Sequence, residues 1–136
     1  MTFVLDASIT LAWCFVDQSS EMADRVLGQL EGEEALAPAI WPLEVANGLR
    51  AAERRGRLDL ADLAQVRELL TALPVEVERV TLDTALGEVA EFARQLDLTA
   101  YDAAYLALAA RRGIPLATAD DRLRRACEQA GVELVG

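Results

Sequence analysis

Short apolar runs alternate with helix-like segments along this chain, and that alternation is what most restricts its fold. Apolar runs suited to strands lie at 2–5, 35–37, 75–80, 114–118 and 132–135. Strands separated by helices predict a mainly parallel sheet whose two faces are covered by those helices. We therefore expect an α/β fold: a three-layer sandwich with a mainly parallel sheet of four or five strands.

The segments between these runs carry apolar residues at helical spacing. They predict a helix soon after Asp6 and further helices over 22–30, 43–56, 59–73, 82–96, 100–112 and 123–130. Thr99 is placed to cap the helix that starts at Ala100, and Gly113 is placed to end it. The run 75–80 alternates apolar and polar residues, as a half-exposed edge strand does.

The length of 136 residues suits one domain, which would bury about 68% of the surface of its unfolded chain. No linker, repeat or low-complexity segment interrupts the pattern. We therefore expect a single domain over residues 1–136. Because 53% of the residues are hydrophobic and only 5% are aromatic, its core should consist mainly of Ala, Leu and Val.

Two missing residue types narrow the chemistry. The chain has no histidine and no lysine, so all 13 basic residues are arginines. This excludes catalytic triads and zinc sites that need histidine, and phosphate loops and Schiff bases that need lysine. Carboxylates acting with a metal ion remain.

The cysteines and the hydropathy pattern indicate where the protein resides. Cys14 and Cys127 both lie within helix-like apolar patterns, and without a signal peptide we expect two reduced thiols. No apolar run approaches the ~18 residues of a membrane span. The expected protein is soluble and cytoplasmic, with no membrane partner.

Four acidic residues stand where an apolar run ends or a helix begins: Asp6, Glu44, Asp102 and Asp120. Ligands of parallel sheets bind beyond the carboxyl ends of the strands, where Asp6 and Asp120 are expected. Taken singly, each acid also has a structural explanation, because carboxylates stabilise the first turn of a helix. Asp102 is the clearest such case, since its spacing from Thr99 is that of a capping box. Asp6 is harder to explain so, because Ser8 is able to cap the following helix.

The net charge of -10 argues against a protein that binds nucleic acid by charge alone. Arginines nevertheless cluster at 50–57 and at 111–125. They either form basic ridges beside an acidic cavity or lie on solvated helix faces. The sequence leaves both explanations open.

Four motifs, in order, resemble those of PIN-domain nucleases. They are VLDAS at 4–8, WPLEVAN at 41–47, LTAYDAAYLALA at 98–109 and LATAD at 116–120. Each motif is weak alone, but the set is specific and spans nearly the whole chain. The pattern is most similar to the VapC-type toxins of bacterial toxin–antitoxin pairs.

This resemblance implies an endoribonuclease that uses Mg²⁺ or Mn²⁺ and is inhibited by a cognate antitoxin. By position, Asp6, Glu44, Asp102 and Asp120 would be catalytic, with Asp6, Asp102 and Asp120 binding the metal. Ser8, Asn47 and Thr118 would be polar supports of that site. Either Asp120 or Asp121 is able to approach the metal, and the Thr-x-Asp spacing favours Asp120. The resemblance also implies a homodimer.

The expected chemistry is metal-assisted hydrolysis of RNA phosphodiester bonds, by one ion or by two. Single-stranded or looped RNA is the favoured substrate, because an exposed phosphate must enter a narrow acidic cleft. Trp13 and Trp41 offer stacking surfaces, although core packing explains both better. The rival hypotheses are a Mg²⁺-binding regulatory module and an interaction module without nuclease activity.

Overall fold

The computed structural model describes residues 2–136, and it contains one parallel four-stranded sheet. The strand order is β3-β2-β1-β4. These strands are β1 (Phe3–Leu5), β2 (Ala35–Pro38), β3 (Val75–Glu78) and β4 (Leu116–Ala117). Each neighbouring pair is parallel, with Val4 opposite both Leu36 and Leu116. The predicted α/β fold is confirmed, and 75–78 lies at an edge of the sheet as expected.

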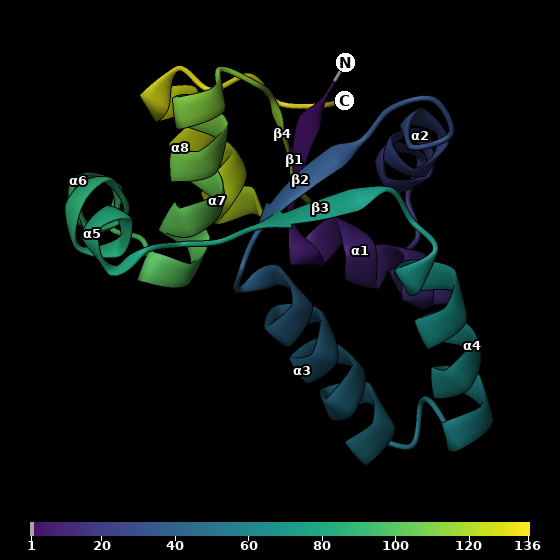
Figure 1. Cartoon of the computed structure of the whole chain (residues 1–136). Helices are drawn as coiled ribbons and strands as arrows, with labels where there is room; N and C mark the ends of the chain where they lie inside the picture. The colour runs from purple at the N-terminus through teal and green to yellow at the C-terminus, as the bar shows by residue number, and fades with distance from the viewer. Residues whose placement is uncertain (1) are drawn as a thin grey trace.

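Helices cover both faces of the sheet (Figure 1). The connections from β1 to β2 and from β2 to β3 contain α1 (Ala7–Cys14), a 3₁₀ turn η1 (Val16–Gln18), α2 (Glu21–Gln29), α3 (Trp41–Arg54) and α4 (Leu60–Thr71). The connection from β3 to β4 contains α5 (Leu82–Thr84), a π-helical segment η2 (Ala85–Val89), α6 (Ala90–Leu96) and α7 (Ala100–Arg112), and α8 (Asp121–Ala130) follows β4. Figure 1 shows α7 and α8 on one side of the sheet and α1 and α2 on the other.

The strand order explains this division of the helices. From β1 the chain adds β2 and then β3 on one side, and it later returns past both to place β4 on the other side of β1. Parallel crossovers are almost always right-handed, so a reversal of direction moves the connecting helices to the opposite face. A binding crevice is expected at the point of reversal, beyond the ends of β1 and β4.

Two predicted strands are clearly shorter in the structure: the run 114–118 forms only the two-residue β4, and the run 132–135 forms no regular strand. Only Leu134 forms a bridge, parallel to Leu116, supported by the hydrogen bonds Leu116 N to Glu133 O and Val135 N to Leu116 O. The alternating residues do produce extended backbone. Because β4 is two residues long, however, it offers too short a ladder for a regular fifth strand.

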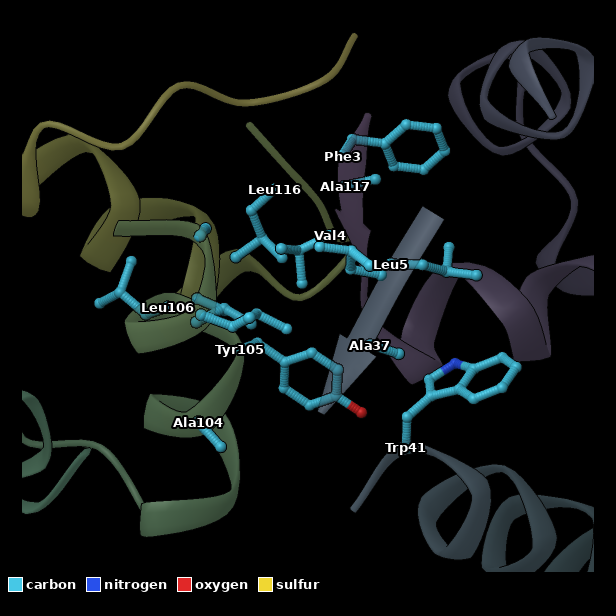
Figure 2. Packing of buried hydrophobic residues seen from close by; sticks show 14 of the residues in the cluster. Phe3, Val4, Leu5, Ala37, Trp41, Ala104, Tyr105, Leu106, Leu116 and Ala117 are labelled. Atoms are coloured by element: carbon cyan, nitrogen blue, oxygen red, sulfur yellow. The ribbon is translucent and has the colours of Figure 1, made fainter. Parts of the chain in front are cut away.

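The core lies on both faces of the sheet, against α7 and α8 on one side and α1, α2 and α3 on the other, and it is built mainly from Ala, Leu and Val (Figure 2). Every residue from Ala103 to Ala109 is buried, and so is all of β1. Trp41 packs into this core and donates a hydrogen bond from Nε1 to Thr10 Oγ1 at 3.0 Å. Trp13 is partly buried and donates to the Ala23 carbonyl oxygen at 2.8 Å. The expectation that both tryptophans pack rather than stack on a ligand agrees with these contacts.

Two further expectations concern the thiols and the membrane. Cys14 and Cys127 are both free cysteines. Within residues 2–136, every helix is too short or too polar to pass through a lipid bilayer.

Candidate active site

Four carboxylates from separate parts of the chain line one open cavity of about 300 Å³. They are Asp6, Glu44, Asp102 and Asp120, joined by Ser8 and Asn47 among the lining residues. Asp6 follows β1 and Asp120 follows β4 by three residues, while Glu44 and Asp102 lie in the first turns of α3 and α7. The carboxyl ends of parallel strands and the helices that start near them meet at one edge, which is why these distant residues converge.

Asp6 is the most buried of these acids, with 5% of its surface exposed. Its Oδ2 accepts hydrogen bonds from Ser8 Oγ at 2.6 Å and from Thr118 Oγ1 at 2.7 Å. Thr118 lies beneath the cavity and is fully buried. Ser8, which is the second residue of α1, therefore holds Asp6 instead of capping the helix as its position had suggested.

Backbone amides fix the direction of these hydrogen bonds. Ala119 N donates to Ser8 Oγ at 2.9 Å, and Asp120 N donates to Thr118 Oγ1 at 3.1 Å. An amide N–H is only a donor, so each hydroxyl must accept from it and has its own proton left for Asp6. This network ties the end of β1 to the end of β4 and favours the ionised form of Asp6.

Glu44 is held by a residue that the sequence analysis did not assign to the site. The Tyr105 hydroxyl, from the middle of α7, lies 2.5 Å from Glu44 Oε1. Tyr105 is fully buried on a helix face otherwise made of Ala and Leu. A signal was present in the sequence, because a tyrosine on such a face must find a partner for its hydroxyl.

Asp102 is not needed to cap α7. Thr99 Oγ1 accepts from the Asp102 backbone N–H at 3.1 Å, which is the expected cap. The reciprocal bond of a capping box is found between Asp59 and Asp62, whereas the Asp102 carboxylate shows no such bond to Thr99. The structural explanation of Asp102 therefore accounts for its backbone and leaves its side chain available to the cavity.

Asp120 does serve as a helix cap. Its Oδ1 accepts from Arg122 N at 2.9 Å and from Leu123 N at 3.5 Å at the start of α8. Asp121, the first residue of that helix, is exposed and is not among the residues that line the cavity. Of the two adjacent acids, Asp120 is the one that faces the other carboxylates.

The cavity disfavours negative charge in the absence of a cation. Burial raises the pKa of Asp6, of Glu44 and of Asp102, and in each case a neighbouring carboxylate raises it further. Hydrogen bonds oppose the shift for Asp6 and Glu44, and the charge of Arg122 opposes it for Asp102. Carboxylates gathered in this way gain stability when a cation is placed among them.

The oxygen atoms of the site suit a hard divalent cation. Asp6, Glu44 and Asp120 each engage one carboxylate oxygen in the hydrogen bonds above, and those bonds do not use the other oxygen. Within residues 2–136 no three acidic or cysteine side chains stand in positions to hold one ion directly. Mg²⁺ usually keeps several waters and binds through one or two carboxylates, so this looser set of ligands fits it.

Among the residues that the structure describes, four of the nine clustered arginines form ion pairs away from the cavity. Arg112 lies 3.2 Å from Glu78, Arg111 pairs with Glu88, Arg57 pairs with Asp17, and Arg50 pairs with Glu53. Arg122 differs, because its charge acts on Asp102. Solvated helix faces therefore explain part of the basic pattern, and the charge of Arg122 reaches the site.

The fold resembles solved structures over most of its length. A crystal structure of PAE2754 from Pyrobaculum aerophilum matches with a TM-score of 0.67 and 26% identity, covering 93% of this chain and 87% of that one. A toxin–antitoxin complex from Klebsiella pneumoniae matches with a TM-score of 0.61, covering 87% of this chain and 86% of that one. At 16% identity the second match supports the fold alone.

Sequence comparison agrees with the structural matches. Ribonuclease VapC3 of Pyrobaculum aerophilum is 36% identical over 127 residues, which cover 90% of this chain and 92% of that protein. The PIN domain family matches residues 3–129. The resemblance carried by the four motifs is confirmed, and the chain belongs to the PIN-domain family.

Proposed function

We propose that this protein is a metal-dependent endoribonuclease, the toxin of a toxin–antitoxin pair, that hydrolyses RNA phosphodiester bonds at the site of Asp6, Glu44, Asp102 and Asp120. The observation that carries the proposal is the meeting of these four carboxylates in one open cavity. Membership of the PIN-domain family and the relative named Ribonuclease VapC3 support the choice of RNA as substrate.

The residues of the site would have different roles in the reaction. Asp6, Asp102 and Asp120 would hold Mg²⁺ or Mn²⁺, in part through water molecules, and Ser8 and Thr118 keep Asp6 in place by hydrogen bonds. A bound cation would supply an acidified water and offset the negative charge that develops on the phosphate. Glu44 would orient the attacking water, and Asn47 offers a polar contact at the exposed side of the cavity.

The shape and charge of the cavity also indicate which partners would bind there. An exposed phosphate of single-stranded or looped RNA is able to enter it, because that backbone is not held in a duplex. A cognate antitoxin would inhibit the enzyme by covering the cavity, and the net charge of -10 favours a cationic segment in that antitoxin. We further propose that the protein acts as a homodimer in the cytoplasm.

The decisive experiment is cleavage of a labelled RNA by the purified protein with Mn²⁺, repeated with a chelator. We expect Asp102→Asn to lose at least about a hundredfold in rate, because Asp102 lies in the cavity and its side chain is not needed for the helix cap. Asp121→Asn is the matched control, since it removes the same charge outside the cavity. Circular dichroism verifies that both variants fold.

The rival functions predict different results. A regulatory module would bind Mn²⁺ without cutting RNA, and an interaction module would do neither. Equal cleavage by the wild type and by Asp102→Asn would show a contaminating nuclease or a site elsewhere, and would refute the assignment.

A further inference from the structure

Tyr105 is fully buried and polar, and the roles proposed above for the site residues do not include it. It lies in the middle of α7, between the sheet and the start of α3, and its hydroxyl reaches out of the apolar core (Figure 2). Among residues 2–136, its side-chain hydrogen-bond partner is Glu44, whose Oε1 lies 2.5 Å from the hydroxyl. A buried hydroxyl that touches a carboxylate of the candidate site calls for an explanation.

The proton of this hydrogen bond belongs to Tyr105. The Tyr105 hydroxyl donates this hydrogen bond, and Glu44 Oε1 accepts it. An ionised carboxylate has no proton of its own, so the phenol must supply one. Tyr105 thus connects α7 with Glu44 on α3, and Glu44 lines the cavity.

Glu44 needs such a restraint. Its side chain is only half-buried, and the charges of Asp6 and Asp102 repel it. It has three rotatable bonds, and in the absence of a donor it would turn toward solvent and away from the other carboxylates. Hydrogen bonds to charged groups are among the strongest available to a protein, so one fixed donor is enough to select a single orientation.

We propose that Tyr105 is a positioning residue of the active site: its hydroxyl fixes the Glu44 carboxylate at the wall of the cavity, where Glu44 orients the attacking water. This inference rests on the proposed function and assigns Tyr105 no contact with RNA, because its side chain is fully buried. The competing explanation is that the hydroxyl merely satisfies its own need for a partner.

Tyr105→Phe separates these explanations, since it removes only the hydroxyl from an otherwise unchanged ring. We expect kcat for RNA cleavage to fall at least about tenfold and KM to remain within about twofold, because binding does not involve Tyr105. Tyr101→Phe is the matched control, because it makes the same change on the same helix at a side chain that is 60% exposed. It should retain wild-type kcat.

A second variant tests whether Tyr105 acts through Glu44. If it does, Tyr105→Phe combined with Glu44→Gln should be no slower than Glu44→Gln alone. Additive losses would overturn the proposal, and so would a wild-type kcat in Tyr105→Phe. A loss of kcat accompanied by an equally large rise in KM would indicate general distortion and would also overturn it.

A crystal structure of Tyr105→Phe gives a result that does not depend on activity. The proposal requires the Glu44 carboxylate to leave its present position in that variant, and an unmoved Glu44 would refute it even if no RNA is cleaved. Failure of the proposed function looks different, because the wild-type protein itself would then be inactive or Glu44→Gln would cut as fast as the wild type.

Discussion

At the scale of single residues, the site depends on two hydroxyl groups that hold one buried carboxylate. Ser8 and Thr118 each accept from a backbone amide and each donate to the same oxygen of Asp6. Burial of a carboxylate lowers the stability of the folded state unless the carboxylate is hydrogen-bonded. The bonds from these two residues therefore reduce the free-energy cost of burying Asp6. Removing either hydroxyl leaves one backbone N–H without its acceptor and Asp6 Oδ2 with one donor instead of two.

Thr118→Val tests this network, because valine keeps the shape of threonine and lacks the hydroxyl. The change removes one donor from Asp6 and leaves the Asp120 N–H without its acceptor. We expect a loss of about 1–3 kcal/mol in the free energy of unfolding, measured by urea denaturation. Thr118→Ser keeps the hydroxyl and should lose less. A Thr118→Val protein as stable as the wild type would show that the network contributes nothing.

The positions of the four acids and of the polar residues Ser8 and Thr118 beside Asp6 could be predicted from sequence, but the partner of Glu44 could not. Each acid adjoins an apolar run or opens a helical pattern, and that local context is visible in the chain. The pairing of Glu44 with Tyr105 joins residues 61 positions apart. Such a pair depends on how α7 crosses the sheet and on which way each side chain turns, and neither is a property of a local pattern.

At the scale of elements, α7 shows how a helix start and a site residue share the same turn. Thr99 caps the helix through the backbone of Asp102, and the Asp102 side chain projects a charge toward Asp120 and Asp6. The cap is a function of the Thr99 side chain, and the charge is a function of the Asp102 side chain three residues later. They should therefore respond separately to mutation.

We expect Thr99→Ala to lower the free energy of unfolding by about 1 kcal/mol, since it removes the side-chain acceptor at the helix start. Asp102→Asn should not lower it in metal-free protein, because the backbone cap remains and one repelling charge is removed. Thermal melting with a chelator present measures both changes. A marked loss of stability in Asp102→Asn would return Asp102 to a purely structural role.

The predicted elements differ most from the structure where tertiary packing decides the outcome. Alternating side chains at 132–135 indicate extended backbone, which is present, but a strand also needs a partner of equal length, and β4 is too short. The helix predicted over 82–96 is present with a π-helical segment, Ala85–Val89, in its middle. Its register follows from packing against α7, which periodicity in the sequence does not report.

At the scale of the whole molecule, folding brings together charges that the unfolded chain keeps apart. The pKa values of Asp6, Glu44 and Asp102 are all raised above their usual 3.8 or 4.5, first by burial and then by mutual repulsion. The folded protein consequently binds protons at these groups more tightly than the unfolded chain does. Without metal, the site opposes folding whenever these groups are ionised.

Metal-free protein should therefore become more stable as the pH falls from neutral toward the usual pKa values of these groups, 3.8 and 4.5, because protonation of groups whose pKa is raised by folding favours the folded state. The urea midpoint, measured with a chelator, should rise over that interval. In Asp102→Asn the rise should be smaller, and in Asp121→Asn, which loses a charge outside the cavity, it should equal that of the wild type. A midpoint that falls steadily with pH in all three proteins would contradict the prediction.

A divalent cation should offset, at neutral pH, the loss of folding stability that the ionised carboxylates cause. A ligand that binds only the folded state adds about 2.7 kcal/mol of stability at 100 times its dissociation constant, which for a domain of this size raises Tm by on the order of 5–10 °C. We expect that response to Mn²⁺ in the wild type, measured by calorimetry at neutral pH. It should be at least halved in Asp102→Asn and in Asp120→Asn, and retained in Asp121→Asn, because only the first two remove a carboxylate from the cavity. Equal rises in all of these variants would mean that Mn²⁺ binds elsewhere on a surface whose net charge is -10.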